Sequence, residues 1–134
     1  MEWPSDEWAS EAAGSVGLLP EAPGLSGTVS LAVTEGTGRK RTEAGFHWRY
    51  QEGEPVDGEA GVDANADLVL LVAGEDAVDL LSGRVEPSVA FMRGRLKASG
   101  DGGLLLGFLK STTDSKFDAW RQKVAAGTPA AALS

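Results

Sequence analysis

The stretch RVEPSVAFMRGRLKASGDGGLLLGFL, residues 84–109, carries the signals that decide the fold. Pro87 suits the first turn of a short helix, where its missing N–H is not needed, and Gly94 suits the position just after that helix ends. Residues 95–99 alternate between polar and apolar side chains, which is typical of a half-buried strand. Asp101 then lies where it can cap a second helix. The stretch therefore predicts a helix, a strand and a helix in direct succession.

The second of these helices has an unusually broad apolar face, formed by Leu104, Leu105, Phe108 and Leu109. Such a face must lie against other apolar groups, because apolar surface is unfavourable in water. The residues alone do not decide whether this face packs against the protein's own core, a partner or a ligand.

The order of these motifs resembles the sterol carrier protein 2 (SCP-2) family of lipid-binding domains. The residues that carry the resemblance are Ala90-Phe91-Met92, Gly94-Arg95-Leu96-Lys97 and Gly100-Asp101, and upstream Ala66-Asp67-Leu68, Asp79-Leu80-Leu81 and Gly83. The resemblance covers residues 25–125. The assignment of the N-terminal 24 residues to the same domain rests on their length and position alone. It implies a tunnel between a sheet and the C-terminal helices that holds an acyl chain or a sterol.

Alternation in the first half of the chain predicts a hairpin of two strands. Residues 28–35 alternate cleanly, and the return strand places Phe46, Trp48 and Tyr50 on one face and His47 on the other. Further strands are expected at residues 67–73 and near 59–62, and further helices at 6–16, 76–82 and 116–126. Together the elements predict an α+β fold, with a mainly antiparallel sheet of about five strands and helices packed mostly on one face.

Length and composition bound the class of protein. The 134 residues predict a single domain, 1–134, with a core at 24–126 and a frayed tail at 127–134. The net charge of −8 argues against a nucleic-acid partner. The absence of cysteine, the acidic N-terminus and the shortness of the longest apolar run, 68–73, predict a cytoplasmic protein without a signal peptide.

The resemblance, together with the apolar faces, predicts the walls of a ligand tunnel. The predicted wall residues are Phe46, Trp48, Tyr50, Phe91, Met92, Leu104, Leu105, Phe108, Leu109, Phe117 and Trp120. The expected ligand is a fatty acyl chain, a sterol-like molecule or a similar lipid. No cofactor, metal or catalytic residue is expected, and an enzyme acting on an apolar substrate is a lesser alternative.

Three motifs invite a chemical function that the spacing does not support. Asp63-x-Asn65-x-Asp67 begins like a calcium loop, but the required glycine and glutamate positions hold Leu68 and Gly74. The glycine-rich residues 36–40 lead into a strand, whereas a phosphate loop leads into a helix. The single histidine, His47, lies on the face opposite the aromatic side chains and is expected at the surface.

Charge is distributed unevenly along the chain. Arg39, Lys40 and Arg41 cluster at the predicted hairpin tip and are candidates for transient membrane docking. Residues 52–79 hold nine acidic and no basic side chains, which indicates a solvated surface or a site for a basic protein partner. The second possibility supports an alternative function, an accessory module with a filled tunnel that serves an enzyme.

Overall fold

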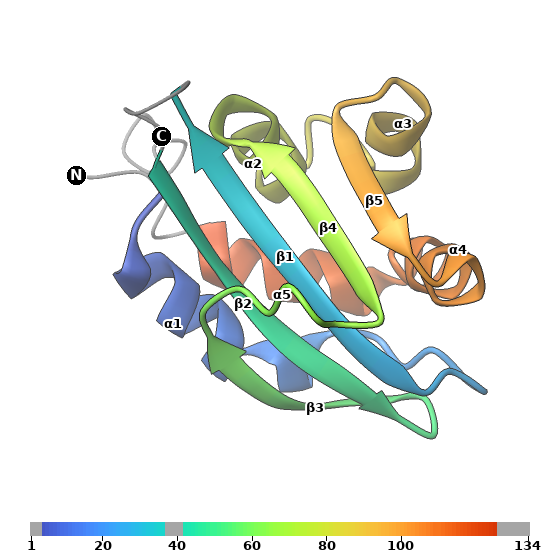
Figure 1. Ribbon diagram of the computed structural model, residues 1–134. Helices are drawn as coiled ribbons and strands as arrows, with labels where there is room; N and C mark the ends of the chain where they lie inside the picture. Colours follow the sequence, from blue (N-terminus) through green and yellow to red (C-terminus); the bar gives the residue numbers. More distant parts are fainter. Residues whose placement is uncertain (1–3, 37–41, 126–134) are drawn as a thin grey trace.

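A five-stranded sheet with helices behind it forms the computed structural model, which describes residues 4–36 and 42–125 (Figure 1). The strands are β1 Gly27–Glu35, β2 Thr42–Gln51, β3 Glu54–Ala60, β4 Leu68–Ala73 and β5 Leu96–Gly100. The helices are α1 Asp6–Gly14, α2 Gly74–Leu81, α3 Pro87–Met92, α4 Gly102–Ser111 and α5 Ser115–Ala125, with a 3₁₀ turn, η1, at Val16–Leu18. The predicted α+β class is confirmed.

The strand order in the sheet is β3-β2-β1-β4-β5, and β1 and β4 are the pair that runs parallel. Leu31 in the middle of β1 lies opposite Phe46 of β2 on one side and Leu70 of β4 on the other. These residues share one face of the sheet with Trp48 and Val72, because side chains alternate along a strand. The helices lie behind this face (Figure 1), so the apolar face is the covered one.

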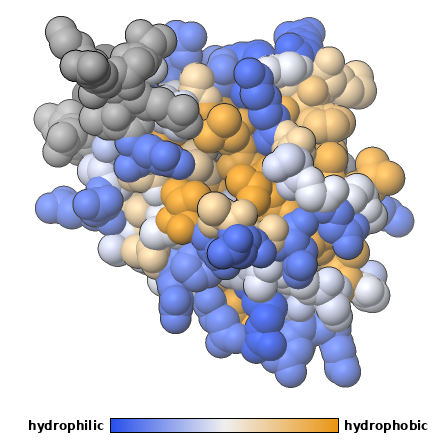
Figure 2. Space-filling view, in the orientation of Figure 1, coloured by the Kyte–Doolittle hydropathy of each residue, from blue (hydrophilic) through white to orange (hydrophobic). Residues whose placement is uncertain are grey.

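The opposite face of the sheet is partly covered by the connection from β3 to β4, which crosses in front of β2 and β1 (Figure 1). Ser30 is fully buried there, and its hydroxyl accepts a hydrogen bond from the backbone N–H of Asp63 at 2.9 Å. Val69 and Leu71 remain half-buried on this face. Figure 2 shows the same side of the molecule, with apolar side chains in its middle and toward its upper right edge and polar ones along the bottom.

The helix boundaries follow the signals in the sequence. Ser5 caps α1 by accepting from the N–H of Trp8 at 3.1 Å, and Asp101 caps α4 by accepting from the N–H of Leu104 at 3.0 Å. Pro87 lies in the first turn of α3, as predicted. The longest described helix, α5, has 11 residues, and none of the described helices has the length and apolar character to cross a membrane.

The edge strand β3 differs from the prediction, because it begins at Glu54 and ends at Ala60 rather than lying near 59–62. Its acidic residues and Pro55 carry little strand signal, but an edge strand tolerates such residues because one side faces solvent. Asp57 has a φ of 56°, and the register with β2 shifts in this region as in a β-bulge.

Gly58 on β3 allows α1 and η1 to approach the sheet closely. A Cβ atom at this position would lie 2.1 Å from the carbonyl oxygen of Ala13 and 2.7 Å from Cγ2 of Val16. We expect Gly58→Ala to lower the free energy of unfolding by about 1–3 kcal/mol, because the N-terminal segment must move away from the sheet.

Gly14→Ala is the matched control, since a Cβ at Gly14 would meet open space at the end of α1. This variant should be neutral or slightly stabilising, because alanine favours a helix over glycine. Denaturant midpoints measure both variants, and equal stability of Gly58→Ala and the wild type would contradict the packing described.

Candidate functional site

An apolar cavity of about 50 Å³ lies between the sheet and the helices. None of the described residues that line it carries a charge. The lining residues are Trp8, Leu19, Leu31, Val33, Phe46, Trp48, Val72, Ala77, Leu80, Leu81, Pro87, Leu96, Phe108, Phe117 and Trp120. The cavity can therefore accept an apolar group.

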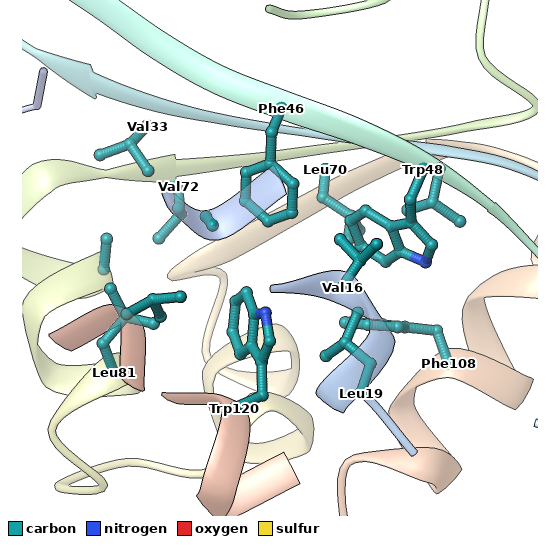
Figure 3. Packing of buried hydrophobic residues seen from close by; sticks show 14 of the residues in the cluster. Val16, Leu19, Val33, Phe46, Trp48, Leu70, Val72, Leu81, Phe108 and Trp120 are labelled. Atoms are coloured by element: carbon teal, nitrogen blue, oxygen red, sulfur yellow. The ribbon is translucent and has the colours of Figure 1, made fainter. Parts of the chain in front are cut away.

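Aromatic rings form the sheet side and one helix side of this cavity (Figure 3). Phe46 and Trp48 point from β2 toward the helices, and their ring centroids are 5.4 Å apart. Phe108 of α4 lies 5.9 Å from Trp48, and Trp120 of α5 lies 6.0 Å from Phe46, centroid to centroid. These four rings all belong to the lining of the cavity.

The structure brings five of the predicted wall residues to the cavity and leaves six elsewhere. The five are Phe46, Trp48, Phe108, Phe117 and Trp120. Tyr50, Leu104 and Leu109 are buried in the same core but do not line the cavity, whereas Phe91 and Leu105 are partly buried. Met92 is 79% exposed and points away from the core. Whether a ligand contacts any of the eleven remains a prediction.

The N-terminal segment supplies two wall residues that the sequence patterns did not predict, Trp8 of α1 and Leu19 after η1. The family resemblance begins near residue 25 and the motifs that carry it begin at Ala66, so nothing in it pointed to this segment. The helical spacing of Trp8 with Ala9 and Ala12 was the available signal, because an amphipathic helix must bury its apolar face against something.

Polar atoms without partners lie at the aromatic wall. The Nε1 atoms of Trp48 and Trp120 and the hydroxyl of Tyr50 are buried and have no hydrogen-bond partner of normal geometry among the described residues. Burial raises the pKa of the Tyr50 hydroxyl above its ordinary value of 10.0, and the neighbouring polar groups of Trp48 and Ser111 offset part of the rise.

His47 lies on the sheet face that points away from the cavity, as its strand position predicts. It is half-buried rather than fully exposed, because its Nδ1 atom hydrogen-bonds the carbonyl oxygen of Gly61 at 2.8 Å. Its Nε2 atom lies 3.5 Å from the carboxylate of Glu59. These contacts tie β2 to the edge strand and its connection, away from the apolar site.

The segment that begins like a calcium loop is a turn entering β4. Asp63 accepts a hydrogen bond from the N–H of Asn65 at 2.9 Å, and Asp67 accepts from the N–H of Thr28 at 2.9 Å. In residues 4–36 and 42–125, no three acidic or histidine side chains gather as a metal site would require.

The charged segments differ in how far the structure describes them. Arg39, Lys40 and Arg41 lie outside the described residues, as does the tail at 127–134. Within the acidic segment 52–79, Asp76 and Asp79 bind the Arg95 guanidinium at 2.7 and 2.6 Å. Asp76, and then Asp79, raise the pKa of Arg95 above its ordinary value. Part of the acidic segment is therefore neutralised within the fold.

Comparison with known proteins gives one family and one fold. The model of the SCP-2 sterol transfer family matches residues 17–110. No curated protein sequence matches the chain significantly.

Solved structures share the fold at low identity. A conserved hypothetical protein from Thermus thermophilus has 22% identity and a TM-score of 0.68, with 97% of this chain and 94% of that chain covered. Sterol carrier protein 2 has 18% identity and a TM-score of 0.64, with 92% and 98% covered. A palmitated SCP2L2 from Aedes aegypti has 19% identity and a TM-score of 0.52, with 64% and 71% covered.

The raised pKa of Tyr50 predicts a loss of stability at alkaline pH. In the unfolded chain Tyr50 loses its proton near pH 10, whereas the folded protein retains it to higher pH. The unfolded state then binds fewer protons, so the stability present below pH 10 is lost as the pH rises.

Tyr50→Phe removes the one tyrosine of the chain and leaves every other titrating group in place. Between about pH 9 and pH 11 this variant should lose less unfolding free energy than the wild type. Denaturant titrations across that range measure the difference, and parallel profiles for the two proteins would contradict the prediction.

Proposed function

Because this chain belongs to the SCP-2 sterol transfer family, we propose that it binds and transfers an apolar ligand without catalysing a reaction. The ligand is a fatty acyl chain, a sterol-like molecule or a similar lipid. The observation that carries the proposal is the uncharged, aromatic cavity between the sheet and the helices. The palmitate of the Aedes aegypti protein, which shares this fold, supports a ligand of this class.

Burial of the ligand chain alone supplies enough free energy for binding. Each buried CH₂ group contributes about 0.8 kcal/mol, so a chain of ~14 methylenes gains roughly 11 kcal/mol before costs. Association and ordering remove several kcal/mol, which leaves a dissociation constant of about 1 μM or somewhat lower. No nucleophile, acid or base is needed for such a carrier.

The size of the cavity sets a condition on uptake. Its volume of about 50 Å³ is one third of that of an engineered apolar cavity of ~150 Å³ that binds benzene. A whole acyl chain therefore enters only if the helices move away from the sheet. We place that movement in the helix layer, because the sheet is fixed by hydrogen bonds between all five strands.

The small cavity also favours a second candidate function. An accessory module whose interior is filled would need no space for a ligand and would use its surface, including the acidic segment 52–79, to bind a basic partner. Ligand binding separates the two functions. The cytoplasm remains the compartment that the sequence predicts.

The test is binding of a fluorescent long-chain fatty acid, which we expect at about micromolar affinity with quenching of tryptophan emission. Phe108→Ala should shift the preference toward bulkier or longer chains, because it enlarges the cavity. Leu104→Ala is the matched control on the same helix, since Leu104 is equally buried but does not line the cavity.

Both truncations should cost stability, about 3–5 kcal/mol for Phe108→Ala and about 2–5 kcal/mol for Leu104→Ala, as measured by denaturant midpoints. The change in ligand preference should accompany the first alone. A folded wild type that binds neither acyl nor sterol probes would favour the accessory module instead.

Delivery to membranes is proposed for the basic cluster at Arg39, Lys40 and Arg41. Each basic residue near an anionic surface contributes about 1 kcal/mol, which orients a brief encounter without holding the protein there. Replacing all three with glutamate should slow ligand transfer to anionic vesicles and leave equilibrium ligand affinity unchanged. Equal transfer rates at low salt, where screening is weakest, would assign the cluster no role in delivery.

A further inference from the structure

The cavity wall holds a hydrogen-bond donor that the fold itself does not use. Trp120 of α5 is 5% exposed, lines the cavity, and has no hydrogen-bond partner for its Nε1 atom among the described residues. Figure 3 shows the nitrogen of Trp120 turned toward the interior, on the side of Val16 and Leu19. Phenylalanine would give an aromatic wall without this donor, so the indole N–H costs stability at this position.

Trp48 carries a second buried indole N–H in the same wall, but this one has a polar neighbour. The hydroxyl of Tyr50 lies beside Trp48, close enough for the two groups to influence each other. The Nε1 atom of Trp120 has no hydrogen-bond partner among the described residues, and the rings of Phe46 and Phe117 lie near it at centroid distances of 6.0 and 5.7 Å. Trp120 is therefore the donor that is available to a ligand.

Water does not suit this donor well. The cavity is large enough for a water molecule, but a buried water is stable only with two to four polar partners. The described side chains that line the cavity offer indole N–H groups, which donate and do not accept. An apolar ligand with one acceptor oxygen suits this wall better than water does, because the oxygen accepts from the N–H and the apolar part fills the rest of the cavity.

The uncharged side chains of the described wall limit the kind of acceptor that can bind. Among the described residues that line the cavity none is basic, so a carboxylate there would be a buried anion without a cation from this wall, which is strongly unfavourable. The carboxylate of a fatty acid must stay outside the cavity or bind in its protonated form. An ester, ketone or ether oxygen carries no such cost.

We propose that the cavity selects neutral apolar ligands that carry a hydrogen-bond acceptor, and that the indole N–H of Trp120 binds this acceptor. The inference rests on the proposed carrier function and adds the chemical class of its ligand. It assigns Trp120 the role of a specificity-determining residue, whereas the remaining wall contributes apolar contact.

The test compares 2-tridecanone with tridecane, both supplied from a cyclodextrin complex, by displacement of the fluorescent acyl probe. Trp120→Phe should lower the ratio of ketone affinity to alkane affinity roughly two- to tenfold, the range expected for one hydrogen bond. The smaller ring changes the apolar contact of both ligands, whereas the lost N–H affects the ketone alone. Phe117→Leu is the control, because it alters the ring packed on Trp120 and keeps the N–H. It should weaken both ligands equally.

A second measurement uses the wild type alone and does not depend on a variant that folds. The chain has four tryptophans, so the indole N–H groups give a small set of resonances. The Trp120 indole proton should move downfield with 2-tridecanone and not with tridecane. An unmoved resonance, or an equal ratio of ketone to alkane affinity in Trp120→Phe and the wild type, would overturn the inference.

Failure of the carrier function gives a different result. In that case neither the ketone, the alkane nor the acyl probe binds the folded wild type, and the inference falls with the function on which it rests. If the acyl probe binds and the ratio of ketone affinity to alkane affinity is the same in the wild type and in Trp120→Phe, the carrier function stays in place and the inference alone is overturned.

Discussion

The register of β1 between its two neighbours determines where every wall of the site lies. Leu31 is opposite Phe46 of β2 on one side and Leu70 of β4 on the other, so three strands direct their apolar residues toward the helices together. A slip of one residue in either pairing would send a whole strand's apolar set to the opposite face. The parallel pairing of β1 with β4 makes this register non-local, because the β2–β3 hairpin and its crossing connection separate the two strands.

The helix layer depends on a buried cation as well as on apolar contact. Arg121 of α5 is 8% exposed, donates to the carbonyl oxygen of Leu80 at 3.4 Å and to Glu86 at 3.3 Å, and pairs with Asp118. Its guanidinium also lies 5.3 Å from the ring centroid of Phe117. One side chain thus connects α2, the entry to α3 and α5, all of which contribute to the cavity wall. These helices are therefore expected to move together if the helix layer moves away from the sheet.

The sequence predicted the parts of the fold that depend on local patterns. The face shared by Phe46 and Trp48, the cap at Asp101 and the proline at the start of α3 are confirmed, because alternation and capping act over a few residues. The predicted position of β3 was wrong, since pairing at a sheet edge, not composition, sets its ends.

The site was harder to predict from the sequence than the fold. Nothing in the apolar pattern of α4 separates Phe108, which lines the cavity, from Leu104, which packs elsewhere in the core. The burial of Arg121 was not predicted, because a basic residue on a helix usually faces solvent. Its partners Leu80 and Glu86 lie far away in the sequence.

An interior built only for stability and one built for a ligand differ in how they treat polar atoms. A filled core gains nothing from a buried N–H without a partner, and a phenylalanine would serve better at that position. A binding cavity tolerates the same cost in its empty state, because a ligand that brings an acceptor recovers it. Among the described residues, the indole N–H of Trp120 is unpaired in a wall of uncharged side chains. This arrangement fits the proposed carrier better than an accessory module with a filled interior. On the carrier proposal, a loss of stability in the ligand-free protein would be part of the basis for selectivity.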